Sequence, residues 1–340
     1  MSGTFPYQGS SLDKVALFKN AMSLDVSPLK VITFAGKKIP FGWNRLPQGV
    51  RWGVKSSNQI LAFITNGMFA YEQVDILTDA FSEVARMNKC KKGYPSPIEY
   101  YRQHTQQIET LAVELSQKRP DLPMVRHRRD AVWQLAKECE TFKISITKSL
   151  LQHFGANVVL DMSAGHGDRV LGAAAAGMLV YHGFDPATDM RQPYDQMLEF
   201  IEQNATVGKL QPNFSQRYQI ATADFLTIDL QPKAYDMVFT SPPFYDYEIY
   251  ADEPTQSIAG KTSLEQWKNE FYYPYLQKAW NALMDGRYFA LYIADTAEIK
   301  FTEDTNRFIT ETLGGQLYAV IACADDTLKS ASPLWVWQKS

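Results

Sequence analysis

The chain is poor in the residues that build disulfides and metal sites. Its 340 residues include three cysteines, Cys90, Cys139 and Cys323, which lie far apart and form no Cys-x-x-Cys pair or Cys/His cluster. This spacing argues against a disulfide framework and against a zinc site. The thiols are expected to stay reduced, which predicts an intracellular, cytoplasmic location with no metal centre.

Long apolar runs and a large net charge are also missing. No segment approaches the roughly 20 apolar residues of a membrane span, and the first residues lack the pattern of a secretory signal. A net charge of −3 gives no overall attraction to nucleic acid, so any such surface must be a local patch. With 45% hydrophobic and 21% charged residues, the chain is expected to be globular, with one large domain and a smaller region.

From about residue 142 onward, short apolar segments alternate with segments of helical spacing. The expected strands are 158–160, 179–184, 218–221, 237–240 and 288–293, with helices at 145–154, 168–177, 190–207, 263–284 and 302–313. Two further strands, 316–323 and 334–338, follow without a helix between them. The alternation predicts an α/β fold with a parallel sheet covered on both faces, closed by an antiparallel hairpin.

The first part of the chain has a less regular pattern. Short strands are expected at 31–34, 51–54 and 60–64, and helices at 71–88 and 97–118. A linker at 120–124 precedes a helix from Arg126 to about Glu140. We therefore predict an α+β accessory region at 1–125 and a second domain at 126–340.

The first regular strand ends in a glycine turn, Asp161-Met-Ser-Ala-Gly165-His-Gly167, that opens a helix. Glycine lets the backbone approach a ligand, and the helix N-terminus offers free N–H groups to a carboxylate or ribose. A dinucleotide fingerprint is disfavoured, because Val170 stands where its third glycine belongs. Asp185 ends the second strand, where a carboxylate can accept hydrogen bonds from ribose hydroxyls; a turn-forming Asp-Pro pair is the alternative.

A second motif, Thr240-Ser-Pro-Pro-Phe244, follows the fourth strand of this series. The exocyclic amine of a nucleobase is a poor nucleophile, because its lone pair is delocalised into the ring. Acceptors for its two N–H bonds favour a tetrahedral nitrogen, and the Ser241 hydroxyl and Pro242 carbonyl can serve as these acceptors, held rigidly by the prolines. Phe244 can stack on a flipped base. The alternative is a Pro-Pro strand end with a capping serine.

In this order, the two motifs resemble the class I S-adenosylmethionine-dependent methyltransferases that methylate exocyclic amines of DNA bases. The resemblance covers about residues 140–340 and implies a seven-stranded, mostly parallel Rossmann-like sheet and S-adenosylmethionine as cofactor. The turn Ala164–Arg169 and the run Asp246-x-Glu248-x-Tyr250 also resemble phage- and virus-associated DNA methylases that are assigned by motif. This second resemblance implies a phage- or virus-encoded protein.

The resemblance and the residue types together give a set of predicted site residues. The expected cofactor-binding residues are Phe142, Lys143, Asp161, Ser163, Ala164, Gly165, Gly167, Asp185, Asp224 and Phe225. The expected catalytic residues are Ser241, Pro242, Pro243 and Phe244. The expected substrate-binding residues are the aromatic Tyr245, Tyr247 and Tyr250 and the basic Lys89, Lys91, Lys92, Arg126, Arg128 and Arg129, which could neutralise phosphates. Solvated surface is the alternative for the basic residues.

The predicted function is methyl transfer from S-adenosylmethionine to N4 of cytosine in DNA, or to N6 of adenine. Serine at the first motif position favours cytosine, because the adenine enzymes of the resembled family more often carry Asp or Asn there. An RNA base, a protein glutamine and a non-catalytic binding subunit stay open as alternatives. The expected partner is nucleic acid, DNA before RNA, with a protein partner possible through residues 1–125 and no membrane.

Overall fold

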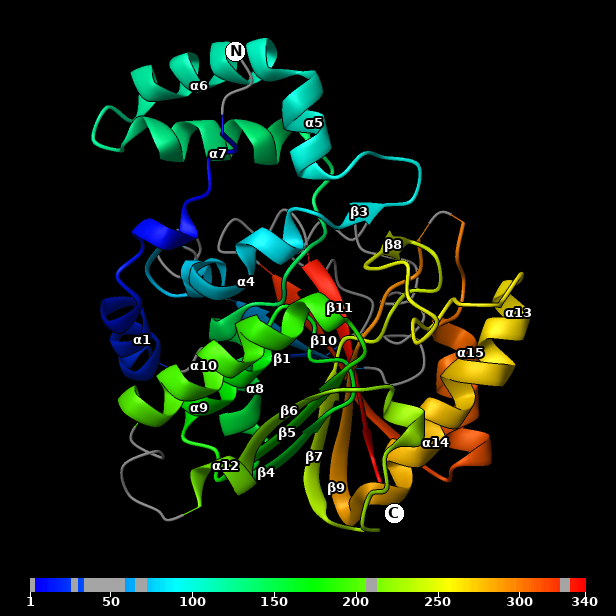
Figure 1. The fold of residues 1–340 in the computed structure, drawn as a ribbon. Coiled ribbons are helices and arrows are strands. Elements are labelled where there is room, and N and C mark those ends of the chain that lie inside the picture. Colours follow the sequence, from blue (N-terminus) through cyan, green and yellow to red (C-terminus); the bar gives the residue numbers. More distant parts are fainter. Residues whose placement is uncertain are drawn as a thin grey trace.

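The computed structural model describes residues 4–25, 30–33, 59–64, 72–205, 213–296, 298–324 and 331–340. A nine-stranded sheet runs through its centre in the order β1-β2-β10-β11-β9-β7-β4-β5-β6 (Figure 1). The strands are β1 Lys30–Thr33, β2 Gln59–Ile64, β4 Val158–Asp161, β5 Val180–Asp185, β6 Tyr218–Thr222, β7 Tyr235–Thr240, β9 Leu283–Tyr292, β10 Gln316–Ala324 and β11 Ala331–Gln338. A separate two-stranded ribbon joins β3, Cys90–Lys91, to β8, Glu248–Ile249.

Seven of these strands confirm the predicted fold class. Strands β6, β5, β4, β7 and β9 are parallel to one another, and β11 is antiparallel to both β9 and β10. The chain therefore has the α/β, Rossmann-like sheet that its alternating pattern predicts, with the closing antiparallel hairpin formed by β10 and β11.

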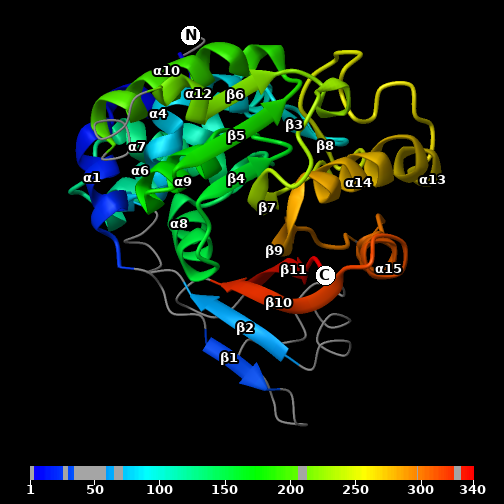
Figure 2. The same ribbon diagram turned by 90° about the horizontal axis from the view of Figure 1, so that it is seen from below.

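The N-terminal part of the chain extends this sheet. Strand β2 pairs in parallel with β10, and β1 pairs antiparallel with β2 (Figure 2). These two strands confirm the expected segments near 31–34 and 60–64, while the expected strand at 51–54 lies outside the described residues. The sequence did not predict that they join the main sheet, because an edge pairing depends on a partner more than 250 residues away in the chain.

Helices cover both faces of the sheet (Figure 2). One face carries α1 Lys14–Ser23, α4 Asp79–Arg86, α8 Ile144–His153, α9 Asp168–Ala176 and α10 Arg191–Asn204, and the other carries α13 Leu264–Trp267, α14 Tyr273–Ala282 and α15 Thr302–Arg307. The middle of β7, residues 237–239, is apolar because both faces of the strand are buried: Met237 and Phe239 belong to one hydrophobic core and Val238 to the other. No helix in the described ranges is long and apolar enough to cross a membrane.

Three further helices form a small unit above the body, α5 Pro97–Gln103, α6 Thr105–Lys118 and α7 Met124–Leu135 (Figure 1). They pack around a third core that includes Ile98 and Ile108. The single helix expected at 97–118 is divided at His104, whose backbone is not helical. The helix expected to reach Glu140 ends at Leu135, because the chain becomes extended at Ala136. The expected helix at 71–88 is the turn η3 Asp75–Thr78 followed by α4.

Candidate active site

A cavity of about 570 Å³ opens where the carboxyl ends of the parallel strands meet. Its walls come from the loops after five strands, with Ser163 and Gly165 after β4, Asp185 at the end of β5, Asp224 and Phe225 after β6, Ser241–Phe244 after β7, and Asp295 after β9. This edge is where open α/β sheets bind ligands. The fold thus brings together motifs that are up to about 130 residues apart in the sequence.

The glycine turn adopts the backbone conformation for which glycine is needed. Gly165 has a φ of 60° and Gly167 a φ of 95°. A Cβ on Gly167 would lie 2.2 Å from the Sδ atom of Met197, so the position has no room for a side chain. The Gly165 N–H donates to Asp185 at 2.9 Å, and the Tyr194 hydroxyl donates to the Gly165 carbonyl at 2.5 Å. The turn is therefore held open beside the cavity.

Asp161 lies beneath the cavity instead of lining it. Its side chain is fully buried and accepts hydrogen bonds from the Arg169 Nε at 2.7 Å, the Tyr181 hydroxyl at 2.5 Å and the Thr240 hydroxyl at 2.7 Å. The carboxylate thus ties the glycine turn to the end of β7. This geometry points to a positioning role for Asp161, in place of the predicted direct contact with cofactor.

Asp185 is the acidic group best placed to meet a ligand. It lines the cavity and accepts from the Gly165 N–H at 2.9 Å and the Ala187 N–H at 3.0 Å. Burial raises the pKa of its carboxyl to about 6, against the opposing effect of these hydrogen bonds. The side chain is therefore charged at neutral pH and can accept further hydrogen bonds.

Asp224 and Phe225 stand side by side on the cavity wall. The Asp224 carboxylate caps a short turn by accepting from the Leu226 N–H at 2.9 Å. Phe225 is 3% exposed and has the Lys278 ammonium 5.4 Å from its ring centre. Asp224 is thus a capping residue and Phe225 a core residue, and both also face the cavity.

The remaining predicted cofactor residues differ in position. Phe142 lines the cavity, with its ring 5.3 Å from that of Phe239 and 4.9 Å from that of Tyr292. Lys143 is the residue before α8, and Ala164 is 1% exposed, and neither is among the residues that line the cavity. Their predicted contacts with cofactor therefore gain no geometric support.

All four residues of the Ser241–Phe244 segment line the cavity. The Ser241 hydroxyl donates to the Tyr292 carbonyl at 3.4 Å, and the Phe244 ring meets Phe301 edge-on at 5.6 Å. The next residue, Tyr245, has a φ of 54°, which is rare for a non-glycine residue and often marks a functional site.

The three predicted tyrosines separate in the fold. Tyr245 packs its ring 5.9 Å from that of Trp267 and is not a lining residue. Tyr247 and Tyr250 both line the cavity, and the Tyr250 hydroxyl donates to Glu248. The Tyr245 ring therefore packs against the hydrophobic core, whereas Tyr247 and Tyr250 face the cavity.

The N-terminal part supplies one wall of the cavity through the β3–β8 ribbon. Lys89 lines the cavity beside β3, with its ammonium 2.5 Å from the nearer Asp189 oxygen and its side chain 3% exposed. Lys91 pairs with Glu140 at 3.2 Å and with Glu248 at 3.8 Å. The loop after the Ser241–Phe244 segment is thus held by ion pairs to a segment more than 150 residues earlier.

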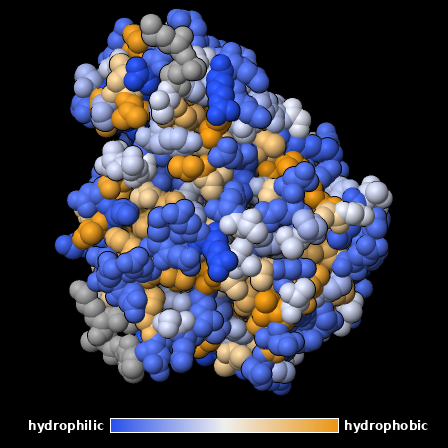
Figure 3. All heavy atoms as spheres, viewed as in Figure 1, coloured by the Kyte–Doolittle hydropathy of each residue, from blue (hydrophilic) through white to orange (hydrophobic). Residues whose placement is uncertain are grey.

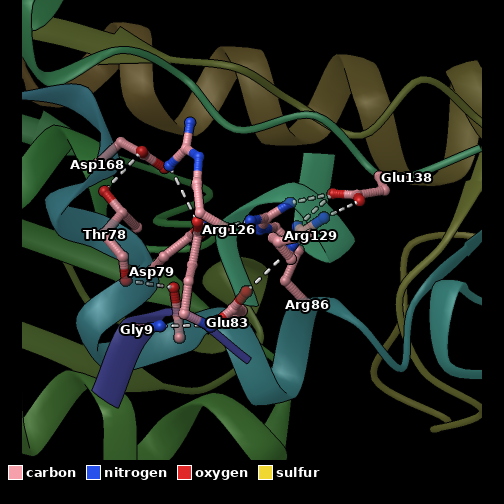
Figure 4. Close-up of polar contacts among 11 residues, drawn as sticks. Gly9, Thr78, Asp79, Glu83, Arg86, Arg126, Arg129, Glu138 and Asp168 are labelled. Carbon is pink, nitrogen blue, oxygen red and sulfur yellow. Dashed lines mark hydrogen bonds and ion pairs between the residues drawn. The ribbon is translucent and has the colours of Figure 1, made fainter. Parts of the chain in front are cut away.

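The basic residues expected to contact phosphate are engaged in ion pairs. Arg129 is buried with Arg86 in a network with Asp79, Glu83 and Glu138 (Figure 4). Its side chain is 4% exposed, so the structure contradicts the predicted phosphate contact of Arg129. Carboxylates also pair with the other cations: Lys92 with Asp246, Arg126 with Asp130 and Arg128 with Glu109.

Several cavity residues were not found from the sequence. Arg169 is 5% exposed, donates to Asp161 and to the Ser163 carbonyl, and has Phe142 5.9 Å away. Tyr275, on α14, shares a 2.6 Å hydrogen bond with the Ser163 hydroxyl. No local pattern could have indicated Tyr275, whereas Arg169 stands in the glycine-turn motif.

The titratable groups near the turn are shifted by burial. Burial lowers the pKa of His166 to about 3, so its imidazole is neutral. Burial raises the pKa of Asp168 to about 7, and its carboxyl accepts from the Thr78 hydroxyl at 2.7 Å. In the described ranges, no group of three or more His, Cys, Asp or Glu residues is placed to hold a metal ion.

Comparison with known proteins gives similarities of structure alone. No protein-family profile and no curated protein matches this chain. Among solved structures, the chain is similar to the magnesium protoporphyrin IX methyltransferase of Synechocystis PCC 6803 with bound S-adenosylmethionine, at 16% identity and a TM-score of 0.39 over 58% of this chain and 78% of that one. It is also similar to a tRNA methyltransferase of Aquifex aeolicus, at 12% identity and a TM-score of 0.35 over 59% and 71%. With TM-scores below 0.5, these likenesses carry no argument about activity.

Proposed function

We propose that this protein is an S-adenosylmethionine-dependent amino-methyltransferase acting on the exocyclic amine of a nucleic-acid base. N4 of cytosine in DNA is favoured over N6 of adenine because Ser241 opens the motif. One observation carries the proposal: the Gly165 turn, the Asp185 carboxylate and the whole Ser241–Phe244 segment line a single cavity. The three features belong to separate motifs in the sequence, and the fold brings them together.

The residues around the cavity fit this cofactor. The lining carboxyl groups outnumber the lining Lys and Arg side chains, which favours a ligand that carries positive charge. The carboxyl groups are Glu140, Asp168, Asp185, Asp224, Glu248 and Asp295, and the cations are Lys89 and Arg169. When bound, S-adenosylmethionine supplies a methyl group on a positively charged sulfur. Asp185 can accept from its ribose hydroxyls, and Asp224 and Phe225 can receive its adenine.

The Ser241–Phe244 segment can hold the target amine. Since the Ser241 hydroxyl gives its hydrogen to the Tyr292 carbonyl, its lone pairs remain available to accept an N–H of the amine. The Pro242 carbonyl can accept the second N–H, and both acceptors are fixed before the substrate arrives. Phe244, held edge-on by Phe301, can offer a ring face to the base.

A protein glutamine is the second candidate substrate. Its side-chain amide presents the same two N–H bonds to Ser241 and Pro242. The observation in its favour is that the six basic residues expected to meet phosphates all pair with carboxylates. A surface whose cations are already paired with carboxylates does not by itself favour a nucleic acid over a protein substrate.

The proposal is tested by single-turnover methyl transfer with saturating cofactor. Ser241→Ala should slow the chemical step by about 100-fold or more, because one of two fixed acceptors is lost. Phe244→Ala should also weaken substrate binding, by roughly 1–3 kcal/mol for a lost stacking surface. Both variants should bind S-adenosylmethionine as the wild type does in calorimetry. Tyr245→Phe is the matched control, since that ring packs against Trp267 outside the cavity.

Two results would contradict the proposal. Wild-type rates in both Ser241→Ala and Phe244→Ala would show that this segment is not the active site. Methylation of a protein with no methylation of DNA or RNA would instead select the second candidate.

A further inference from the structure

We propose that Tyr94 and Tyr247 form a stacking platform at the mouth of the cavity, and that the substrate is an unpaired, single-stranded nucleic acid. The two rings would receive nucleotides next to the target base. This inference rests on the proposed function and adds to it the form of the substrate and a residue, Tyr94, outside the motif-bearing part of the chain.

Hydrogen bonds at the end of the β3–β8 ribbon join the two chain segments that carry Tyr94 and Tyr247. The Lys92 N–H donates to the Tyr247 carbonyl at 3.1 Å, which continues the pairing of β3 with β8. The Tyr94 N–H donates to the Lys91 carbonyl at 3.0 Å across a turn in which Gly93 has a φ of 80°. Tyr94 follows Lys92 by two residues, so its Cα lies at most about 7 Å from that of Lys92. The two tyrosines therefore flank the same hydrogen-bonded junction.

Both rings are exposed, unlike most aromatic residues around the cavity. Tyr94 is 52% exposed and Tyr247 is 38% exposed, whereas Tyr275 is 1% exposed and Phe225 is 3% exposed. Tyr247 lines the cavity and has the Lys91 ammonium 5.4 Å from its ring centre. The ion pairs of Lys91 with Glu140 and Glu248 fix that ammonium, and so support one side of the Tyr247 ring. An exposed ring held in this way, as that of Tyr247 is, suits the stacking of bases.

Exposed apolar side chains are also found elsewhere on the protein, so their position relative to the cavity matters. Figure 3 shows hydrophobic residues scattered over the viewed face among hydrophilic ones, and such single residues need no partner. Trp133, on α7, is 65% exposed, and neither it nor Tyr94 is among the residues that line the cavity. Tyr94 differs from Trp133 because it follows Lys92, whose N–H donates to the Tyr247 carbonyl. Tyr247 is both exposed and part of the cavity wall, so a ligand entering the cavity passes its ring.

Charge favours an unpaired substrate. The excess of lining carboxyl groups disfavours phosphates inside the cavity, so we expect the neutral base to enter while the backbone stays outside. A duplex would have to release its target base, at a cost of a few kcal/mol, and is normally held by cations on both strands. Because carboxylates already pair with Lys91, Lys92 and Arg128, these cations offer less to phosphates than unpaired cations would. Stacking then contributes a larger share of the binding, and it needs bases free of a partner strand.

The experiment measures binding of labelled oligonucleotides of about 12 nucleotides by fluorescence anisotropy. Single-stranded DNA, single-stranded RNA and duplex DNA are compared for wild type, Tyr94→Ala and Tyr247→Ala. Each alanine variant should bind single strands about 5- to 100-fold more weakly, as expected for one lost stacking contact. The loss should be equal at about 50 and 200 mM salt, because stacking is uncharged and only phosphate contacts depend steeply on salt.

Matched variants separate stacking from other effects. Tyr94→Phe and Tyr247→Phe keep the ring and should bind as the wild type does. Tyr318→Ala removes another exposed ring, 41% exposed on β10, and should leave the binding of oligonucleotides unchanged. Unchanged thermal unfolding in all variants would show that the alanine losses are not unfolding.

The outcomes distinguish this inference from the proposed function. If the wild type methylates single strands while both alanine variants bind them normally, the platform is wrong and the function stands. Equal affinity of the wild type for duplex and single strand would also overturn the inference. If the wild type neither binds nor methylates any nucleic acid, both the inference and the proposed function fail.

Discussion

Replacement of Asp161 by asparagine should lower the free energy of unfolding. This loss should be larger than any direct loss in the free energy of ligand binding. The carboxylate is fully buried and is the counterion of Arg169, whose side chain is only 5% exposed. The Asp161→Asn substitution keeps the shape of the side chain but leaves the guanidinium buried without its charged partner, and breaking a buried pair in this way costs about 3–5 kcal/mol. The hydroxyls of Tyr181 and Thr240 would also lose a charged acceptor.

Urea unfolding followed by tryptophan fluorescence measures this loss as a lower midpoint at an unchanged slope. Asp185→Asn is the matched control. Burial already disfavours its charged form, with a pKa of about 6, but asparagine offers only one oxygen to the Gly165 and Ala187 N–H groups. Its loss of stability should therefore be about 1–3 kcal/mol, smaller than that of Asp161→Asn. The same control should weaken S-adenosylmethionine binding by about 2–3 kcal/mol in calorimetry, because a buried acceptor for the ligand is lost. Normal stability of Asp161→Asn together with weak cofactor binding would refute this assignment of roles.

Three further predictions concern the turn and its supports. The affinity of the wild type for S-adenosylmethionine should fall as pH is lowered through about 6, because protonation of Asp185 removes a charged acceptor; calorimetry should find a much flatter profile for Asp185→Asn. Gly167→Ala should lower the unfolding free energy by about 1–3 kcal/mol through its clash with Met197 and its φ of 95°, whereas Gly260→Ala, with a φ of 72° and open space, should cost less in the same urea titration. Arg129→Leu should reduce thermal stability, because two buried glutamates lose their partner, and an unchanged melting temperature would contradict the network.

Much of the fold could be predicted because its signals are local. The strands near 158–160 and 237–240 are short apolar runs that end in glycine or proline, and the helix that begins at Asp168 follows directly from the glycine turn. Helix ends were harder to predict. No residue type at His104 or Leu135 marks these two helix ends, and Glu138, just after α7, forms ion pairs with Arg129 and with Arg86, 52 residues earlier.

The candidate site could be predicted where motifs follow strands. Ser241–Phe244, Asp185 and Gly165 reach one cavity because the carboxyl ends of parallel strands share an edge. The basic residues show the limit of this reasoning. A run such as Arg126–Arg129 has the same composition whether it faces phosphates or glutamates, and only the fold brings Glu83 and Glu138 to Arg129. Whether residues 1–125 recognise substrate or a protein stays a prediction.

The most direct test of the proposed function is methyl transfer to DNA and RNA, followed by nucleoside mass spectrometry. Purified protein is incubated with labelled S-adenosylmethionine and single-stranded substrates, beside the Ser241→Ala variant. The proposed function predicts N4-methylcytosine, or N6-methyladenine as the second base, formed by the wild type and almost absent with the variant. Binding of the cofactor without a methylated base in any nucleic acid, or a methyl group on a ring carbon, would contradict it.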